Sequence, residues 1–218
     1  MQFIIIVYPP MQTKNFPIAT ISIIVLNGII FAGGLMSGEQ TQIIRNYGFI
    51  PDHIFYAEQN LPSGPHSLSL DSLTRLFTSM FIHANFIHIA FNLFALAYLG
   101  VYAERAIGIT RYVLVYVASG ILAALFHGAI ASYFLHNGNV VLIGASGAIS
   151  GIFGIAAVAG NRSAYYWLFL QIIFAVIGSV SALPIAFTAH VGGFIAGVVM
   201  TKVLVRLERA KRKSSYSL

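Results

Sequence analysis

The chain has 218 residues, of which 58% are hydrophobic and only 8% are charged, against about 25% charged residues in an ordinary soluble domain. So apolar a sequence excludes a water-soluble globular protein and indicates one that folds in a lipid bilayer. The net charge of +6 is spread over the ends of apolar stretches, which argues against a nucleic-acid-binding patch, and the lack of cysteine excludes disulfides, thiolate metal ligands and a cysteine nucleophile.

The first apolar segment, 3–7, is too short for the hydrophobic region of a cleavable signal peptide, and Pro9 and Pro10 follow it. We therefore expect the first long apolar stretch, near 16–36, to remain as a membrane anchor. The segment 37–79 mixes acidic, basic and apolar residues. It is predicted to be a long first loop rather than a membrane span.

The rest of the chain divides into apolar stretches close to the roughly 20 residues that a membrane helix needs. Charged residues separate some of them, and polar turns at 136–139 and 178–184 separate the others. The sequence therefore predicts an all-α membrane protein, a six-transmembrane-helix bundle forming one domain over 1–218. The later spans are expected near 80–102, 112–133, 141–160, 164–178 and 184–203.

Lys and Arg collect in the cytoplasmic loops of membrane proteins. With both termini in the cytoplasm, only Arg45 and Arg75 of the 12 basic residues fall on the outer side. We therefore expect both ends inside, with a basic cytoplasmic tail at 206–218. The protein is predicted to be integral and multi-pass, in a bacterial-type cytoplasmic (inner) membrane.

Ionisable residues within membrane spans are costly and mark functional sites. Apart from tyrosines, the ionisable groups in or bordering the apolar stretches are His83, His88, His127 and His190. Spans two, four and six run in one direction. At 1.5 Å per residue, this places His88, Ser146 and His190 roughly 9–13 Å below the outer surface.

Asn92 adds a neutral polar group to the second span. It follows His88 by four residues, so the two share a face of the predicted helix. His83 precedes His88 by five residues in the same predicted span, so it need not share that face.

Ser146 lies between small residues, in the segment Gly144-Ala145-Ser146-Gly147 that follows a polar turn. This pattern is typical of a helix N-terminus, whose free backbone N–H groups favour developing negative charge. In the last span Gly193 and Gly197 form a Gly-x-x-x-Gly pattern, which lets helices approach closely. We therefore expect spans four and six to bring the Ser146 hydroxyl within hydrogen-bond reach of His190, as a base-activated serine requires.

These residues resemble the rhomboid family of intramembrane serine proteases. The resemblance covers roughly residues 70–205 and rests on three motifs in the family's order: His83-x4-His88-x3-Asn92, Gly144-Ala145-Ser146-Gly147, and Ala189-His190-x2-Gly193-x3-Gly197. It implies that Ser146 is the nucleophile and His190 its general base. It implies an oxyanion hole made of His88, Asn92 and the Ser146 backbone N–H, and supporting roles for His83, Gly144, Gly147, Gly193 and Gly197.

The chain also departs from the family pattern. Arg75 resembles the Arg of a Trp-Arg pair in the first loop, but Thr74 stands where the Trp is expected. Ser150 stands where many relatives have a Tyr that stacks on the catalytic His, which leaves open what orients His190. The pair Glu104-Arg105 resembles the family's charged cap after the second span.

The resemblance implies a serine endopeptidase that needs no cofactor or metal and cuts single-pass transmembrane proteins near the outer membrane face. No acidic residue is expected at the depth of Ser146, so we predict a Ser-His dyad. The partners expected are membrane-protein substrates and the lipid bilayer, without nucleic acid, and the oligomeric state stays open. The short fifth span and segment 178–183 are candidates for a gate and cap.

Rival functions find less support in the sequence. A zinc metalloprotease would need a His-Glu-x-x-His motif, which is absent, and an aspartyl protease would need two intramembrane aspartates, whereas Asp52 and Asp71 both lie in the first loop. A metal carrier lacks a carboxylate or thiolate partner for the histidines. A transporter with a histidine relay would not need the Gly-Ala-Ser-Gly segment. The alternatives that remain are a catalytically inactive rhomboid-like protein that binds membrane clients and, with less support, the histidine-relay transporter.

Overall fold

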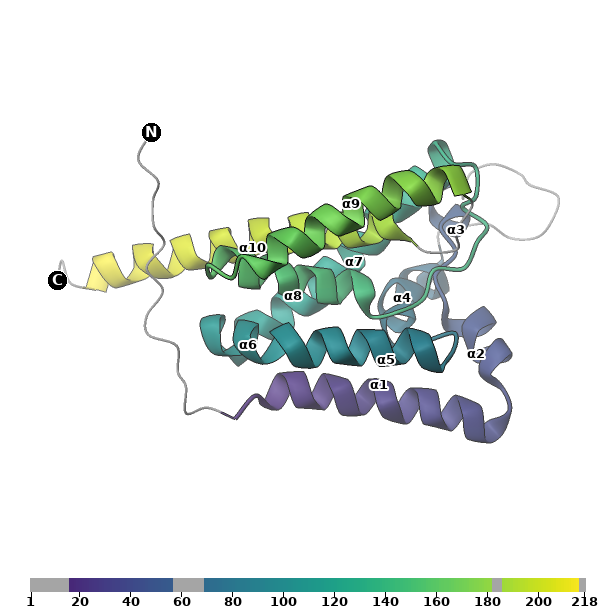
Figure 1. The fold of residues 1–218 in the computed structure, drawn as a ribbon, viewed down its shortest axis with the longest axis horizontal. Helices are drawn as coiled ribbons and strands as arrows, with labels where there is room; N and C mark the ends of the chain where they lie inside the picture. The colour runs from purple at the N-terminus through teal and green to yellow at the C-terminus, as the bar shows by residue number, and fades with distance from the viewer. Residues whose placement is uncertain (1–15, 57–68, 182–185, 216–218) are drawn as a thin grey trace.

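The computed structural model describes residues 16–56, 69–181 and 186–215. Over these residues the chain is helical, and its one β feature is an isolated antiparallel bridge between Phe49 and Leu142. The predicted all-α class is therefore confirmed for the described part (Figure 1). In chain order the elements are α1 (Ile18–Ser37), α2 (Gln40–Tyr47), α3 (Asp52–Phe55), α4 (Leu70–Thr78), the 3₁₀ turn η1 (Ser79–Phe81), α5 (Phe86–Ala95), the π-helical turn η2 (Leu96–Gly100), α6 (Val101–Ile107), α7 (Ile109–Tyr133), α8 (Ser146–Val158), α9 (Ser163–Ser181) and α10 (Phe187–Ser215).

Four of the described helical segments are long and apolar enough to cross a membrane. They are Ile18–Ser37, the continuous rod Phe86–Ile107, Ile109–Tyr133 and Phe187–Lys211. Two further apolar segments are shorter, namely α8 and Ser163–Ile173 of α9. The chain is thus an integral membrane protein, while the count of six spans and the cytoplasmic location of both ends stay predictions.

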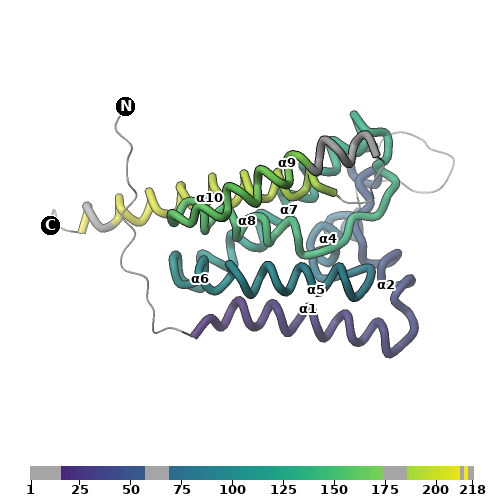
Figure 2. Tube along the Cα trace, in the orientation of Figure 1, coloured from purple at the N-terminus to yellow at the C-terminus, as the bar shows by residue number. Residues whose placement is uncertain are grey.

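The short helix α8 lies at the centre of the bundle. Figure 2 shows it between α5 on one side and α10 on the other, and it packs on both. Its 13 residues span about 20 Å, less than the roughly 30 Å of a hydrocarbon core. All residues from Ala148 to Ala157 are buried. Protein therefore surrounds α8 along most of its length, and the helix does not need to span the bilayer by itself.

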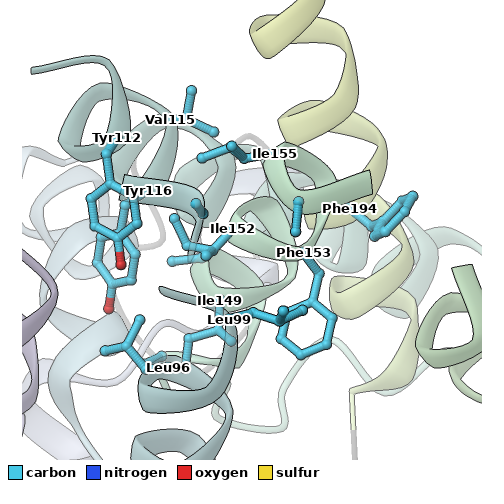
Figure 3. Packing of buried hydrophobic residues seen from close by; sticks show 14 of the residues in the cluster. Leu96, Leu99, Tyr112, Val115, Tyr116, Ile149, Ile152, Phe153, Ile155 and Phe194 are labelled. Atoms are coloured by element: carbon cyan, nitrogen blue, oxygen red, sulfur yellow. The ribbon is translucent and has the colours of Figure 1, made fainter. Parts of the chain in front are cut away.

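The hydrophobic core is built around α8 (Figure 3). Ile152 and Ile155 of α8 are fully buried, and side chains of the second span, α7 and α10 surround them. Burying such a side chain stabilises the fold against leaving it in water by roughly 1.5–3 kcal/mol, but against lipid the gain comes mainly from close packing. The partners drawn in Figure 3 are Leu96, Leu99, Tyr112, Val115, Tyr116 and Phe194.

Glycines bring the backbones of α8 and α10 into contact. A Cβ atom at Gly193 would overlap the carbonyl oxygen of Gly147, and one at Gly197 would overlap the carbonyl oxygen of Gly151. No other residue fits these two positions without moving a helix. The Gly-x-x-x-Gly spacing in α10 therefore does what small residues do at membrane helix interfaces.

The second span starts its helix later than the sequence predicted. α5 begins at Phe86 instead of near residue 80, because Asn85 caps it: the Asn85 side-chain oxygen accepts a hydrogen bond from the His88 N–H at 2.9 Å. His83 lies in the irregular segment between η1 and α5. Its predicted position within the helix of the second span is therefore wrong.

The fourth span and the first loop also differ from the prediction. α8 begins at Ser146 instead of near 141, because Leu142 pairs with Phe49 of the first loop and Gly144 then turns the chain. The stretch 37–79, predicted as a loop, contains the helices α2, α3 and α4. The sequence did not predict these helices, because they are short and rich in charged residues that are equally common in loops.

The ends of the last two helices extend beyond their predicted limits. Gly178 does not end α9, which continues to Ser181, because a single glycine costs a helix only about 1 kcal/mol. The rest of the predicted turn, 182–184, lies outside the described residues. α10 runs on to Ser215, so most of the predicted tail is helical, as its many Lys and Arg residues allow.

Candidate active site

Three of the predicted site residues lie near the N-terminal ends of three helices. Ser146 is the first residue of α8, His88 lies in the first turn of α5, and His190 follows Phe187, the first residue of α10, by three positions. The sequence placed each of them several residues into a span. The three residues lie at a similar depth in the bundle, because α5 and α10 both pack on α8 and the three helices begin at the same end of the bundle.

The chain turns sharply into Ser146. Gly144 has φ +114°, a backbone conformation that side-chain-bearing residues rarely adopt, and its N–H donates to the Ser79 carbonyl at 2.9 Å. α8 then starts at Ser146. The first backbone N–H groups of a helix have no partner inside it, so the Ser146 N–H is available to an anion.

His88 lies over the same turn. A Cβ atom at Gly144 would lie 2.7 Å from the His88 Nε2 atom and 3.7 Å from the Ser146 Oγ atom. Glycine therefore leaves open the space that both polar atoms face. The His88 Nδ1 atom accepts from the Ala84 N–H at 3.4 Å, which leaves the proton of a neutral imidazole on Nε2. His88 thus presents a hydrogen-bond donor beside Ser146.

Asn92 is almost completely buried, at 5% exposure. Its side-chain Nδ2 donates to the carbonyl of His88 at 2.8 Å. An amide nitrogen carries two hydrogens, so one of them stays free for a second acceptor. Asn92 therefore lies one turn below His88 on the same helix, as the sequence indicated.

His190 is held from α9, the fifth predicted span, for which the sequence suggested a gate but no contact with His190. Its Nδ1 atom lies 2.6 Å from the Oε1 atom of Gln171 in α9. Its ring also lies 6.0 Å from that of Trp167 and 5.9 Å from that of Phe187, between ring centres. Among the described residues, no hydrogen bond joins the Ser146 hydroxyl to His190.

His83 packs against His88, although the sequence did not require the two residues to share a helix face. The two ring centres are 5.0 Å apart with the rings edge to face. The His83 Nε2 atom accepts from the Ala145 N–H at 3.5 Å, and the Gln40 side chain donates to the His83 carbonyl at 2.5 Å. His83, at 1% exposure, is therefore a buried support between the first loop and the start of α8.

A small cavity adjoins the Ser146 side chain. Its volume is about 20 Å³, room for roughly one water molecule. Residues from four segments line it, including Met80, Gly144, Ser146, Gly147 and Ala189. Within the described ranges, no group of three or more His, Cys, Asp or Glu side chains lies close enough to hold a metal ion.

Sequence reasoning missed two polar residues near the site. Gln171 is one, and its signal was a lone amide within the apolar stretch of α9, where a polar side chain needs a partner. The other is Thr188, whose hydroxyl lies 2.6 Å from the Nδ1 atom of His127 in α7. This contact ties the first turn of α10 to α7, two residues before His190.

The chain resembles a known protein family and several named proteins in sequence. The family model of the Rhomboid domain matches residues 70–207. "RHOMBOID-like protein 1" of Arabidopsis thaliana is 30% identical over 165 residues, covering 66% of this chain and 41% of that protein. "Putative rhomboid protease YdcA" of Bacillus subtilis is 40% identical over 81 residues, covering 37% of this chain and 38% of that protein.

A third relative, "Rhomboid protease AarA" of Providencia stuartii, is 30% identical over 148 residues, covering 56% of this chain and 53% of that protein. The chain thus spans between 38% and 53% of the length of these three relatives. Some relatives are named as proteases and others as rhomboid-like proteins. The matched region contains all of the predicted site residues.

Proposed function

The chain belongs to the rhomboid family, and on that premise we propose that it is an intramembrane serine endopeptidase with Ser146 as nucleophile and His190 as general base. The proposed oxyanion hole consists of His88, Asn92 and the backbone N–H of Ser146. The proposed substrates are single-pass transmembrane proteins, cut near the outer membrane face. The observation that carries the proposal is a donor-bearing imidazole and a serine at a helix start, both facing the space above Gly144.

In the proposed reaction, His190 takes the proton of the Ser146 hydroxyl while Oγ attacks the carbonyl carbon of the scissile peptide bond. The carbonyl oxygen becomes an anion, which the oxyanion-hole donors stabilise. His190 then gives its proton to the leaving nitrogen as the C–N bond breaks and an acyl-enzyme forms. A water molecule, deprotonated by His190, attacks the ester carbon, and Ser146 is regenerated as the acid product leaves.

The small cavity beside Ser146 supports the second half of this reaction, because hydrolysis of the acyl-enzyme needs a water molecule close to Ser146. The resting geometry supports the first half less directly. Hydrogen bonds between catalytic groups are often long in a free enzyme and tighten when substrate binds. We therefore assign the Ser146–His190 hydrogen bond to the substrate complex.

The substrate must also change shape. A transmembrane helix keeps every backbone carbonyl in an internal hydrogen bond, so the scissile bond is hidden until the helix unwinds locally. This requirement favours substrates with small or helix-breaking residues near their outer end.

Labelling with a fluorophosphonate tests the proposal. The probe reacts with base-activated serines, and we expect it to label the purified protein in detergent. Ser146→Ala and His190→Ala should both abolish labelling. Ser150→Ala is the matched control, because Ser150 lies on the same helix, fully buried, with its hydroxyl bonded to the Ser146 carbonyl at 2.6 Å.

A protein that is folded but unlabelled, and that cleaves no single-pass substrate after reconstitution into vesicles, would refute the protease and favour the client-binding alternative. Labelling that survives in Ser146→Ala would refute the assignment of the nucleophile. Cleavage by Ser150→Ala at the wild-type rate would show that loss in the other two variants is specific.

A further inference from the structure

The imidazole of His190 is surrounded by side chains of α9 and of its own helix. Trp167 and Gln171 are four residues apart on α9, so they lie on one face, and both contact His190. Phe187 approaches the ring from the preceding turn of α10, with the two rings nearly perpendicular at 88°. The contact with Gln171 is a hydrogen bond to the ring.

The helix that carries Ser146 does not orient His190. Ser150, one turn along α8, is fully buried and directs its hydroxyl back to the Ser146 carbonyl. Its side chain is also too small to stack on an imidazole. Among the described residues, the hydrogen bond that orients the His190 ring comes from α9.

The α9 face that contacts His190 is itself fixed. The Trp167 ring lies 4.5 Å from that of Phe153 in α8 and 6.4 Å from that of Phe194 in α10, between ring centres. Trp167 is thus packed between the two helices that carry Ser146 and His190. Because Gln171 lies one turn away on the same helix, this packing also fixes its position relative to α8 and α10.

The atoms in contact set the tautomer of His190. The Gln171 Oε1 atom is a carbonyl oxygen, which can only accept a hydrogen bond. The Nδ1 atom that faces it must then carry the ring proton. A neutral imidazole has one proton, so Nε2 keeps its lone pair and is the nitrogen able to take a proton from a serine hydroxyl.

We propose that Gln171 is a positioning residue for the general base, which holds His190 in the Nδ1–H tautomer and fixes the plane of its ring. This inference rests on the proposed protease function. Gln171 takes the place that a buried aspartate has in a soluble Ser-His-Asp triad. An uncharged amide suits this depth, because an ionised carboxylate among apolar side chains within a membrane is costly.

The first test replaces Gln171 by Met, which has nearly the same length but no acceptor oxygen. We expect kcat to fall about 10- to 100-fold with KM within about twofold, a smaller loss than the roughly 10⁴-fold that follows removal of a triad's charged orienting residue. Gln171→Glu keeps a carboxyl oxygen at the same position and should restore most of the lost kcat. Leu170→Met is the matched control, because Leu170 is the adjacent residue and is 48% exposed on the surface of the bundle.

A purely structural role for Gln171 would give a different pattern. It would lower the melting temperature and the amount of folded protein, and Gln171→Glu would then be at least as damaging as Gln171→Met. Wild-type kcat in folded Gln171→Met would overturn the inference. So would a lost kcat that Gln171→Glu fails to recover while it stays folded.

The second test does not depend on activity. In protein labelled with ¹⁵N-histidine, the protonated and unprotonated nitrogens of a neutral imidazole resonate far apart, and His190→Asn identifies the signals of His190. We expect the proton on Nδ1 in the wild type and a mixture of tautomers in Gln171→Met. A proton on Nε2 in the wild type would overturn the inference.

Together the tests separate the two proposals. If the wild type is inactive but His190 has the Nδ1–H tautomer, the proposed protease function is refuted and the proposed Gln171–His190 hydrogen bond stands. An active wild type whose kcat and tautomer are unchanged in Gln171→Met would refute the role of Gln171 and retain the protease.

Discussion

Gly193 of α10 lies directly on the backbone carbonyl of Gly147 in α8, leaving no room for a side chain between the two helices. Gly147 follows Ser146, and Gly193 comes one turn after His190. The separation between the proposed nucleophile and its base is therefore set by a backbone contact. A change in this contact must move one helix against the other.

We expect Gly193→Ala to separate α8 from α10. The added methyl group would overlap the Gly147 carbonyl, and overpacking of this kind costs typically about 1–3 kcal/mol. Turnover should fall more steeply than stability, because a shift of about 1 Å at reacting groups is worth roughly a hundredfold in rate. Thermal unfolding in detergent and kcat on a reconstituted substrate measure the two effects.

The control for this substitution is Gly33→Ala in α1. A Cβ atom at Gly33 meets nothing within 4 Å, so the same chemical change should leave kcat unaltered and slightly favour the helix. Equal losses in the two variants would mean that the α8–α10 contact does not set the site.

Asn92→Ala is expected to reduce kcat with little change in KM. The side chain has one amide hydrogen bonded to the His88 carbonyl and one free, and removing one oxyanion-hole donor typically costs about 10²–10³ in kcat. Steady-state kinetics with a fluorogenic transmembrane peptide measure the loss.

Asn27 provides a control with the same local geometry. Its side-chain nitrogen donates to the carbonyl of Ile23, four residues earlier, at 2.8 Å, and it is fully buried in α1. Asn27→Ala should lower the melting temperature and leave kcat within about twofold of the wild type. A comparable fall in kcat for both variants would remove Asn92 from the oxyanion hole.

The sequence anticipates the features of this chain that depend on repeating patterns. Long apolar stretches predicted α1, the rod of α5 and α6, α7 and α10, because the bilayer fixes the length that such helices need. The spacing of Gly193 and Gly197 predicted a close helix contact, because only glycine allows backbones to touch. Neither inference required knowledge of where a side chain points.

Features that depend on a single side-chain contact could not be predicted from repeating sequence patterns. The start of α5 is set by one side-chain cap from Asn85, and moving that start by a few residues changes His83 from a helical residue into one that packs on His88. Gln171 meets His190 across 19 positions of sequence. The packing of Trp167 between α8 and α10 turns this face of α9 inward.

Glu104→Ala is predicted to destabilise the fold by loosening α1. The Glu104 carboxylate is 5% exposed and accepts from the Ala19 N–H at 3.1 Å, the Thr20 N–H at 2.8 Å and the Thr20 hydroxyl at 2.7 Å. It thereby caps the first turn of α1, where Pro17 supplies no side-chain cap. Removing it leaves buried donors without a partner, at an expected cost of about 2–4 kcal/mol.

Unfolding in a denaturing detergent mixture measures this cost. Thr20→Val keeps the backbone bonds to Glu104 and should lose a smaller part of the stability, about 1 kcal/mol. Glu39→Ala changes an exposed glutamate between α1 and α2 and should be nearly neutral. A loss for Glu39→Ala as large as for Glu104→Ala would show that charge, rather than capping, decides the effect.

Arg75→Gln should loosen the segment that leads from the first loop to the site. The Arg75 Nη1 atom donates to the carbonyl of Arg45 at 2.7 Å and to that of Gly48 at 3.4 Å. The next residue, Phe49, pairs with Leu142, four residues before Ser146. Loss of hydrogen bonds from a charged donor is expected to cost about 1–3 kcal/mol, with faster amide exchange at residues 48, 49 and 142 as the measured result.

Asp71→Asn separates this role of Arg75 from its ion pair. Asp71 contacts the Arg75 Nε atom at 2.7 Å, but its side chain is 64% exposed, and exposed pairs four residues apart on a helix contribute only about 0.3–0.5 kcal/mol. We therefore expect Asp71→Asn to leave amide exchange in the Phe49 segment unchanged. If both variants accelerate exchange equally, the ion pair rather than the carbonyl contacts holds the first loop, because only the ion pair is broken in both.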